Sequence, residues 1–463
     1  MNNYLSEVES RTFKKVIILF LLFALGYSTF SEAEGKTLKK NKKPQKTYSG
    51  KIHSKGNISS KNQKDKQLLI SSLLKKNYPI FKECLDNPDK YNVQIIYTQI
   101  IRDKNNKPSF KEYTYGLNPN KYFYPASLVK LPTICVAFEK LNKLKKMGIN
   151  RNTHIGIGAD YSCQTNMNCE KSNPDSFPTI GNFIKRMLLV SDNPSYNRLY
   201  EFVGQKELNR RMKEIGCSHS YIVQRFSNCS FEENKHTNPF CFLKKDGDTI
   251  CKVPGAYNDE VLKNPFGKIK LGKAYYSPSN ILVNEPMDFS CSNALSLADI
   301  NHVLKAIIFP ESFPENKRFR LSKADYAFLY KYLSMYPRES EYQEYSNYSV
   351  YNDAYKKYLM FGAEKSHLDS TNIRIFNIVG IAYGFMSDCA YIVDFKNKIE
   401  FMLSAVIYVN SDEILNDNKY EYSEIGFPFM KNLGKIIYDF EKRRKRIYHP
   451  NLKNFRQINY LKY

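Results

Sequence analysis

Residues 124–132 of the chain read YPASLVKLP, and residues 180–197 read IGNFIKRMLLVSDNPSYN. The first stretch holds Ser127 and Lys130 three positions apart at the predicted start of a helix. Residues three apart share one helical face, so the amine can reach the hydroxyl. Burial lowers the pKa of a lysine, which can then act as a base. The same S-x-x-K spacing recurs at residues 72–75 in a plain amphipathic helix. The first stretch alone therefore does not specify a catalytic site.

The second stretch places Ser191, Asp192 and Asn193 between two predicted helices, with Pro194 opening the second of them. One interpretation is that this triplet only caps the following helix. Both stretches occur in the order, and with the flanking residues, of one enzyme group. The chain resembles the penicillin-recognising serine hydrolases, and within them the class A β-lactamases.

This resemblance implies a fold and a set of roles. The fold class is α/β, in its α+β form: a β-lactamase-like antiparallel sheet from the N- and C-terminal segments, flanked by helices and interrupted by an α-rich inserted subdomain. Ser127 is then the nucleophile and Lys130 its base, Ser191 relays a proton towards the leaving group, and Asn193 orients Lys130 and the substrate amide. We expect an acyl-enzyme with amide, lactam or ester substrates, formed without a metal or an organic cofactor.

A third family element is only partly present. The family carries K-T-G or K-S-G on a strand that lines the pocket, and this chain has Ile378, Val379 and Gly380 in the corresponding place. Gly380 lets a ligand backbone approach the strand. The N–H of Ile381, with that of Ser127, is predicted to form the oxyanion hole. The family lysine, which holds a substrate carboxylate, is missing.

The fourth element is a glutamate that activates the deacylating water in class A enzymes. The best candidate segment is residues 231–239, FEENKHTNP, with Glu233 as the candidate base. Its spacing differs from that of the family, and Glu232 and Glu233 can also be read as surface acids. Two alternative functions therefore stay open. One is a catalytically weak or inactive envelope-binding protein, and the other is an amidase or peptidase that acts on peptidoglycan peptides.

Hydrophobic periodicity and turn residues predict the following elements. They are helices at 67–84, 127–145, 179–190 and 422–443, and strands at 91–102, 113–115, 374–386, 388–394 and 399–409. The stretch from about 225 to 370 shows no clear pattern. Among the ten cysteines, Cys163 with Cys169 and Cys241 with Cys251 could close short bridges, whereas Cys135 and Cys389 are predicted to be buried thiols.

The N-terminus resembles a signal peptide over residues 1–33, with basic residues before the apolar run 16–26 and a small-x-small site at 31–33. Eleven apolar residues are too few to span a bilayer, which needs about 20, although an uncleaved anchor is the rival interpretation. We therefore expect a protein that is exported to the periplasm or secreted. Residues 34–66 are predicted to be a basic disordered linker.

The predicted serine hydrolase domain covers residues 67–446, with a helical insert at about 126–369, and residues 447–463 form a C-terminal tail. The formal net charge is +24, concentrated in the linker and in a basic run at 442–446. Because no nucleic-acid-binding motif accompanies these runs, we expect no nucleic-acid partner but loose contact of the basic tails with an acidic envelope surface. The expected partner is a small amide or lactam or a cell-wall peptide, and the expected state is a monomer.

Overall fold

The computed structural model describes residues 68–171, 176–368, 371–456, 458 and 460. The predicted signal peptide at 1–33 and the predicted linker at 34–66 lie outside the described residues. None of the helices within the described ranges is long and apolar enough to cross a membrane.

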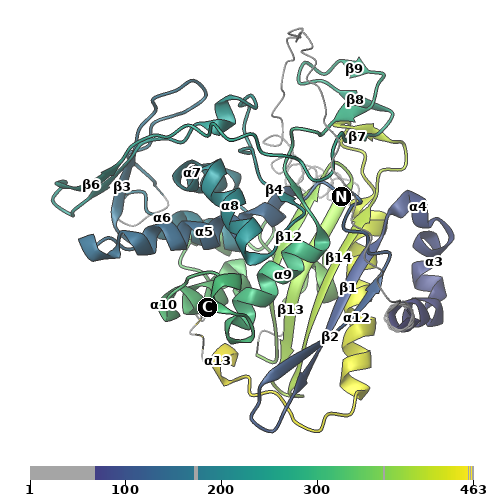
Figure 1. Ribbon diagram of the computed structural model, residues 1–463. Coiled ribbons are helices and arrows are strands. Elements are labelled where there is room, and N and C mark those ends of the chain that lie inside the picture. Colours follow the sequence, from purple (N-terminus) through teal and green to yellow (C-terminus); the bar gives the residue numbers. More distant parts are fainter. Residues whose placement is uncertain (1–67, 172–175, 369–370, 457, 459, 461–463) are drawn as a thin grey trace, which may run out of the picture.

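A five-stranded antiparallel sheet forms the centre of the molecule, in the order β12-β13-β14-β1-β2 (Figure 1). Its strands are β1 (Gln94–Arg102), β2 (Pro108–Tyr115), β12 (Ile373–Ala382), β13 (Phe385–Asp394) and β14 (Ile399–Tyr408). Because β1 pairs with β14, the N- and C-terminal segments join in one sheet. The predicted fold class is confirmed.

Helices cover both faces of this sheet (Figure 1). One face packs against α3 (Tyr78–Asp86), α4 (Pro88–Tyr91) and α12 (Phe427–Arg443). The other faces α5 (Lys130–Lys143), α6 (Ile180–Val190), α7 (Asn193–Val203), α8 (Gln205–Ile215), α9 (Leu297–Ile308) and α10 (Lys323–Ser334). Two further short helices are α11 (Tyr358–Phe361) and α13 (Lys453–Arg456).

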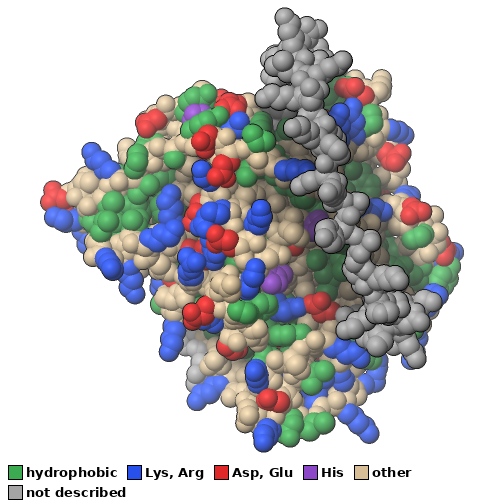
Figure 2. Space-filling model, in the orientation of Figure 1, with side chains coloured by type: hydrophobic (Ala, Val, Ile, Leu, Met, Phe, Trp, Pro, Cys, Tyr) green, Lys and Arg blue, Asp and Glu red, His purple; other side chains and the backbone are tan. Residues whose placement is uncertain are grey.

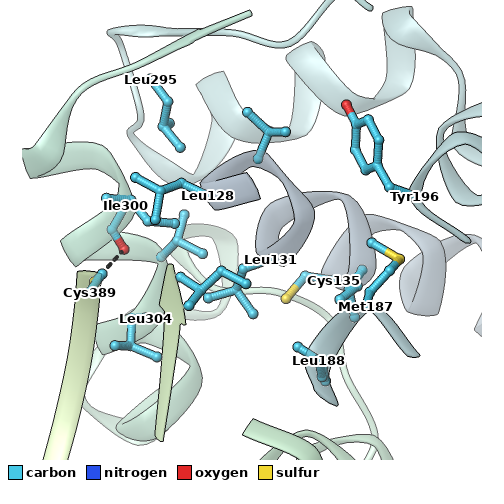
Figure 3. Close-up of a cluster of buried hydrophobic side chains, with 14 of the residues drawn as sticks. Leu128, Leu131, Cys135, Met187, Leu188, Tyr196, Leu295, Ile300, Leu304 and Cys389 are labelled. Atoms are coloured by element: carbon cyan, nitrogen blue, oxygen red, sulfur yellow. Dashed lines mark hydrogen bonds between the residues drawn. The ribbon is translucent and has the colours of Figure 1, made fainter. Parts of the chain in front are cut away.

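The strands alternate their side chains between two hydrophobic cores, which is why they are buried on both faces. In β14, Met402 and Val406 join the core under α5 and α9, whereas Leu403 and Ile407 join the core under α12. Figure 3 shows part of the first core, where side chains of α5 and α6 meet those of α9 and Cys389 of β13. The site described below is built on this first core.

Two predicted element boundaries differ from the structure. The helix predicted at 67–84 breaks at Asn77, and Pro79 lies in the first turn of the new helix α3, where its missing N–H costs nothing. The strand predicted at 374–386 contains a hairpin, because Tyr383 and Gly384 both have positive φ, 52° and 81°. A two-residue turn of this kind matches the twist of the strands that it joins.

The stretch without a clear sequence pattern holds several small sheets as well as helices. The strands within this stretch are β5 (Phe240–Leu243), β6 (Thr249–Val253), β7 (Lys270–Leu271), β8 (Ala274–Tyr276), β9 (Leu282–Val283), β10 (Met287–Asp288) and β11 (Ala294–Leu295). They pair among themselves and with three short strands from outside the stretch, β3 (His154–Ile157), β4 (Ser220–Tyr221) and β15 (Ile414–Leu415). The inserted segment is therefore rich in helices but not purely helical.

One disulfide links Cys163 to Cys229, and Cys169 is a free, exposed thiol. The expected bridge between Cys163 and Cys169 is therefore wrong, because the partner of Cys163 comes from 66 positions away. Cys241 and Cys251 are also free thiols. Cys251 is paired with Phe242, the residue next to Cys241, so the two cysteine side chains lie on opposite faces of the β5–β6 pair. The predicted burial of Cys135 and Cys389 is confirmed.

The basic run at 442–446 is only partly solvated. Arg444 and Arg446 both bind the carboxylate of Glu441, which is fully buried at the end of α12. On the face shown in Figure 2, Lys and Arg side chains are dispersed among acidic and hydrophobic ones. In the expected C-terminal tail, Leu452 and Phe455 are buried against the first core.

Candidate active site

Ser127 lies in a tight turn that leads into α5. Residues Ala126–Val129 form a 3-10 helix, and α5 continues from Lys130. Ala126 has a φ of 44°, in the left-handed region that non-glycine residues seldom adopt. The carbonyl of Pro125 accepts the N–H of Leu128 at 3.0 Å, which closes the turn. Ser127 is half-buried, whereas its neighbours on either side are buried. The turn thus presents this hydroxyl for reaction.

The Lys130 amine joins the predicted residues into one cluster. Its Nζ lies 2.8 Å from Ser127 Oγ, 3.0 Å from Ser191 Oγ and 2.5 Å from the Ser191 carbonyl oxygen. Asn193 Oδ1 lies 2.6 Å from the same nitrogen. The structure therefore brings together Ser127, Lys130, Ser191 and Asn193, as both motifs predicted.

The chemistry of these four partners suits a neutral amine. The Ser191 carbonyl and the Asn193 amide oxygen can only accept, so they take two N–H groups of Lys130. A neutral amine has two N–H groups and one lone pair, and that lone pair is then left for a hydroxyl proton. Ser127 Oγ is close enough to donate it. The arrangement can move a proton from Ser127 to Lys130.

Burial also favours the neutral form of Lys130. The side chain is fully buried, and desolvation holds the pKa of Lys130 well below its usual value. The negative charge of Asp192 opposes this shift, and the positive charge of Lys356 adds to it. Asp192 is in turn bound by the backbone N–H of Ser195 at 2.8 Å and by Arg186 at 3.3 Å. These contacts partly offset the negative charge of Asp192, so that it stabilises a charged Lys130 less.

The turn between α6 and α7 sets the second half of the cluster. Ser191 is the C-cap of α6 with a φ of 60°, and its N–H binds the Met187 carbonyl at 3.1 Å. Asp192 is the N-cap of α7, and Asn193 is the first residue of that helix. The helix-capping interpretation is thus correct for Asp192, and the same turn points Ser191 and Asn193 at Lys130.

Gly380 brings strand β12 against the Ser127 turn. A Cβ at this position would lie 2.4 Å from the Pro125 carbonyl oxygen and 2.8 Å from Ser387 Oγ. Since such contacts are too short for any side chain, glycine is required where the strand passes under the turn. The close approach that we predicted for a ligand backbone is made here by the chain's own backbone at Pro125.

The N–H of Ile381 faces the open edge of the sheet. Ala382 and Phe385 flank the two-residue turn and form a hydrogen-bonded pair, so the residue before them points its N–H away from β13. Because β12 is the edge strand of this sheet, no strand among the described residues takes that N–H. This orientation is the one that an oxyanion hole requires.

Glu233 is not hydrogen-bonded to the Ser127 cluster. Its carboxylate accepts from the Ser230 N–H at 2.6 Å and from the Ser162 hydroxyl at 2.8 Å. These bonds, the backbone one first, hold the pKa of Glu233 below its usual value, which weakens it as a base. Within the described residues, none of the hydrogen bonds of Ser127 or Lys130 involves a carboxylate.

Sequence reasoning did not find Phe226, which faces Lys130. Its ring centre lies 5.3 Å from Lys130 Nζ. Asn197 holds its backbone on both sides, accepting from the Phe226 N–H at 2.7 Å and donating to its carbonyl at 3.2 Å. The ring is therefore fixed beside the amine. No local pattern marks this residue, because α6, α7 and α8 lie between it and Lys130 along the chain.

The lysine that is missing at Ile378 is not replaced by the neighbouring arginine. Ile378 is fully buried in the first core. Arg374, on the same strand face, is bound by both carboxylate oxygens of Glu339, at 2.6 and 2.7 Å. In the part of the chain that the structure describes, no three His, Cys, Asp or Glu side chains are grouped to hold a metal ion.

Comparisons with known proteins find one matching family model and several similar solved structures. Residues 83–249 match the model of the β-lactamase enzyme family. No curated protein matches the chain. Among solved structures, a β-lactamase from Sphaerobacter thermophilus is 11% identical with a TM-score of 0.41, covering 80% of this chain and 95% of its own.

Two further solved structures are similar to the same degree. A β-lactamase from Burkholderia phymatum is 10% identical with a TM-score of 0.43, over 82% of this chain and 98% of its own. PBP-A in an acyl-enzyme complex with penicillin G is 14% identical with a TM-score of 0.43, over 80% of this chain and 97% of its own. The matched segment 83–249 holds Ser127, Lys130 and Ser191. This segment of the chain is therefore similar to the β-lactamase enzyme family.

Proposed function

We propose that the protein transfers acyl groups through Ser127 from amide, lactam or ester substrates, in the manner of a class A enzyme. The observation that carries this proposal is the fully buried Lys130 amine, 2.8 Å from Ser127 Oγ and hydrogen-bonded by no carboxylate within the described residues. Such an amine is a base at neutral pH, and the half-buried hydroxyl beside it becomes the nucleophile.

The steps follow from the contacts of the cluster. The Ser127 hydroxyl proton passes to Lys130 Nζ as Oγ bonds to the substrate carbonyl carbon. The N–H groups of Ser127 and Ile381 stabilise the negative oxygen. Ser191 then donates its hydroxyl proton to the departing nitrogen or oxygen and regains one from Lys130, 3.0 Å away. Asn193 keeps the Lys130 amine in place throughout.

Acylation of Ser127 is tested with a reactive β-lactam and with a fluorophosphonate probe. We expect one adduct by intact mass, and peptide mapping should locate it on Ser127. Ser127→Ala should carry no adduct, and Ser72→Ala, the control at the other S-x-x-K spacing, should be labelled like the wild type. Labelling that maps to another residue, or that persists in Ser127→Ala, would remove the proposal.

A second candidate, a protein that is acylated but releases the acyl group slowly, is favoured by what surrounds Lys130. Release needs a base that activates water next to the ester. Phe226 places an apolar ring 5.3 Å from the Lys130 amine, and Glu233 is engaged by Ser162 and Ser230. Such a protein would act as a binder or sensor of its substrate rather than as a fast hydrolase.

The lifetime of the adduct distinguishes the two candidates. We expect the penicillin adduct of the wild type to persist for minutes or longer after free penicillin is removed, as followed by intact mass over time. Phe226→Glu should shorten this lifetime, and Phe226→Leu, the size-matched apolar control, should not. Rapid turnover of a chromogenic cephalosporin by the wild type would instead establish a true hydrolase with a base from elsewhere.

We further propose that the protein is exported and that its domain begins near residue 67. The pattern at residues 1–33 supports export, and so does the Cys163–Cys229 disulfide, because disulfides persist mainly in oxidising compartments. A cell-wall peptide or a small lactam then becomes an accessible substrate. Fractionation of cells that express the full chain, with N-terminal sequencing of the exported form, tests the export and the cleavage after residue 33.

A further inference from the structure

A buried polar cluster lies behind the candidate active site. It consists of Lys356 and Lys357 from the loop before α11, Asn377 of β12 and Asp388 of β13, each no more than 4% exposed. Asp388 accepts from Asn377 Nδ2 and from the Leu359 N–H, both at 2.9 Å. Neither the S-x-x-K motif nor the S-D-N motif includes any of these residues.

The two adjacent lysines have different partners. Lys357 uses all three of its N–H groups inside the fold, on the carbonyls of Leu333 and Ile375 and on Asn377 Oδ1, at 2.6 to 2.8 Å. Lys356 instead reaches α6. Its Nζ binds the Leu188 carbonyl, and the Met187 carbonyl lies 3.4 Å away. Of these two adjacent lysines, Lys356 is therefore the one that contacts the helix that ends at the active site.

The carbonyls that Lys356 binds belong to the last turn of α6. Carbonyls in the last turn of a helix lack partners within the helix, and they form the negative end of its dipole. The Met187 carbonyl also accepts the Ser191 N–H, and the Ser191 carbonyl binds Lys130. Two buried lysines thus hold the same helix end, Lys130 from the substrate side and Lys356 from the sheet side.

We propose that Lys356 is a positioning residue of the active site, which fixes the end of α6 so that Ser191 meets Lys130 and which places a second positive charge beside the Lys130 amine. The inference rests on the proposed acyl transfer. It also explains how the site functions with Ile378 in place of the family lysine: a cation from a different segment of the chain lies next to the S-D-N turn.

The charges around both amines agree with this role. Lys130 faces Asp192 of α7, itself bound by Arg186 of α6, and the charge of Lys356 favours the neutral form of Lys130. Lys356 faces Asp388 of β13. Burial lowers the pKa of Lys356 to about 7 and raises the pKa of Asp388 to about 7, and each charge partly offsets the shift of the other.

The test compares two neighbouring lysines that are equally buried. Lys356→Met removes the contact with α6 and the charge, and Lys357→Met is the matched control. In Lys356→Met, the pKa of Lys130 should rise, because a positive charge in a poorly solvated site is lost. The acid limb of the acylation rate should then move to higher pH by the same amount, with about tenfold slower acylation on that limb. Lys357→Met should leave the limb in place even if it lowers stability.

Two further variants separate the contact from the charge. Lys356→Gln keeps a donor for α6 but no charge, and we expect it to shift the limb like Lys356→Met while folding more stably. Lys356→Arg keeps the charge and should restore the wild-type limb. Equal shifts in the Lys356→Met and Lys357→Met variants, or no shift in either, would overturn the inference.

A measurement of the Lys130 pKa that needs no enzyme activity tests the positioning role separately from the proposed function. Lysines labelled with 15N at Nζ can be titrated by NMR, with Lys130→Arg to assign the Lys130 signal. A rise of the Lys130 pKa in Lys356→Met supports the positioning role even if no probe acylates Ser127. An unchanged Lys130 pKa contradicts that role even if the wild type is acylated.

Discussion

Replacing Lys130 by Ala is expected to slow acylation of Ser127 at least a hundredfold, without loss of the fold. The side-chain nitrogen of Lys130 lies 2.8 Å from Ser127 Oγ. Loss of a positioned general base typically costs about 10²- to 10⁴-fold. The measurement is the rate of adduct formation with a β-lactam, followed by intact mass across pH 5 to 9.

The pH dependence gives this prediction a direction. The free amine is the active form, so the wild-type rate should rise with pH and level off above the Lys130 pKa, which burial holds well below its usual value. Lys130→Ala should lose this rise. Lys130→Arg should not restore the rate, because a guanidinium stays charged at these pH values. An active Lys130→Arg variant would contradict the neutral-amine mechanism.

The second large effect concerns stability. Glu339→Gln is expected to lower the free energy of unfolding by about 3 to 5 kcal/mol, because it leaves the buried charge of Arg374 without its partner. Each of these two residues is 4% exposed, and their guanidinium and carboxylate groups form two parallel bonds. The pair ties β12, the strand of Gly380, to the segment that precedes Lys356. Equilibrium unfolding in urea measures the loss.

Two controls make this result specific. Asp248→Asn breaks the ion pair between Asp248 and Lys244, whose side chains are 69% and 54% exposed, respectively. This change should alter the free energy of unfolding by no more than about 1 kcal/mol. The double variant Arg374→Met with Glu339→Leu removes both charges and should recover part of the loss. A loss of under about 1 kcal/mol in Glu339→Gln would mean that water solvates Arg374 there.

Residues close together in the chain carried most of the correct predictions. Ser127 and Lys130 are three positions apart on a turn that opens a helix, so their contact follows from local backbone geometry. Ser191 and Asn193 are fixed by one capping turn between two amphipathic helices. The sheet was predictable because strands with apolar side chains at consecutive positions have to be covered on both faces.

Other features of the site depend on residues that only the fold brings together. Lys356 meets Leu188 across 168 positions, and Phe226 faces Lys130 from beyond α7. Cys163 pairs with Cys229 rather than with the nearer Cys169. No periodicity or turn residue signals such contacts, because they are set by how helices and strands pack.

The sequence by itself determined the contact between Ser127 and Lys130 and the sheet on which they rest, since each depends on spacing within a helix, a turn or a strand. Only the tertiary structure decided what surrounds the base: a second lysine at the end of α6, an apolar ring beside Lys130, and Glu233 engaged by Ser162 and Ser230. The physical reason is that the pKa and water access of a buried group depend on every charge and surface packed around it, whatever their distance along the chain.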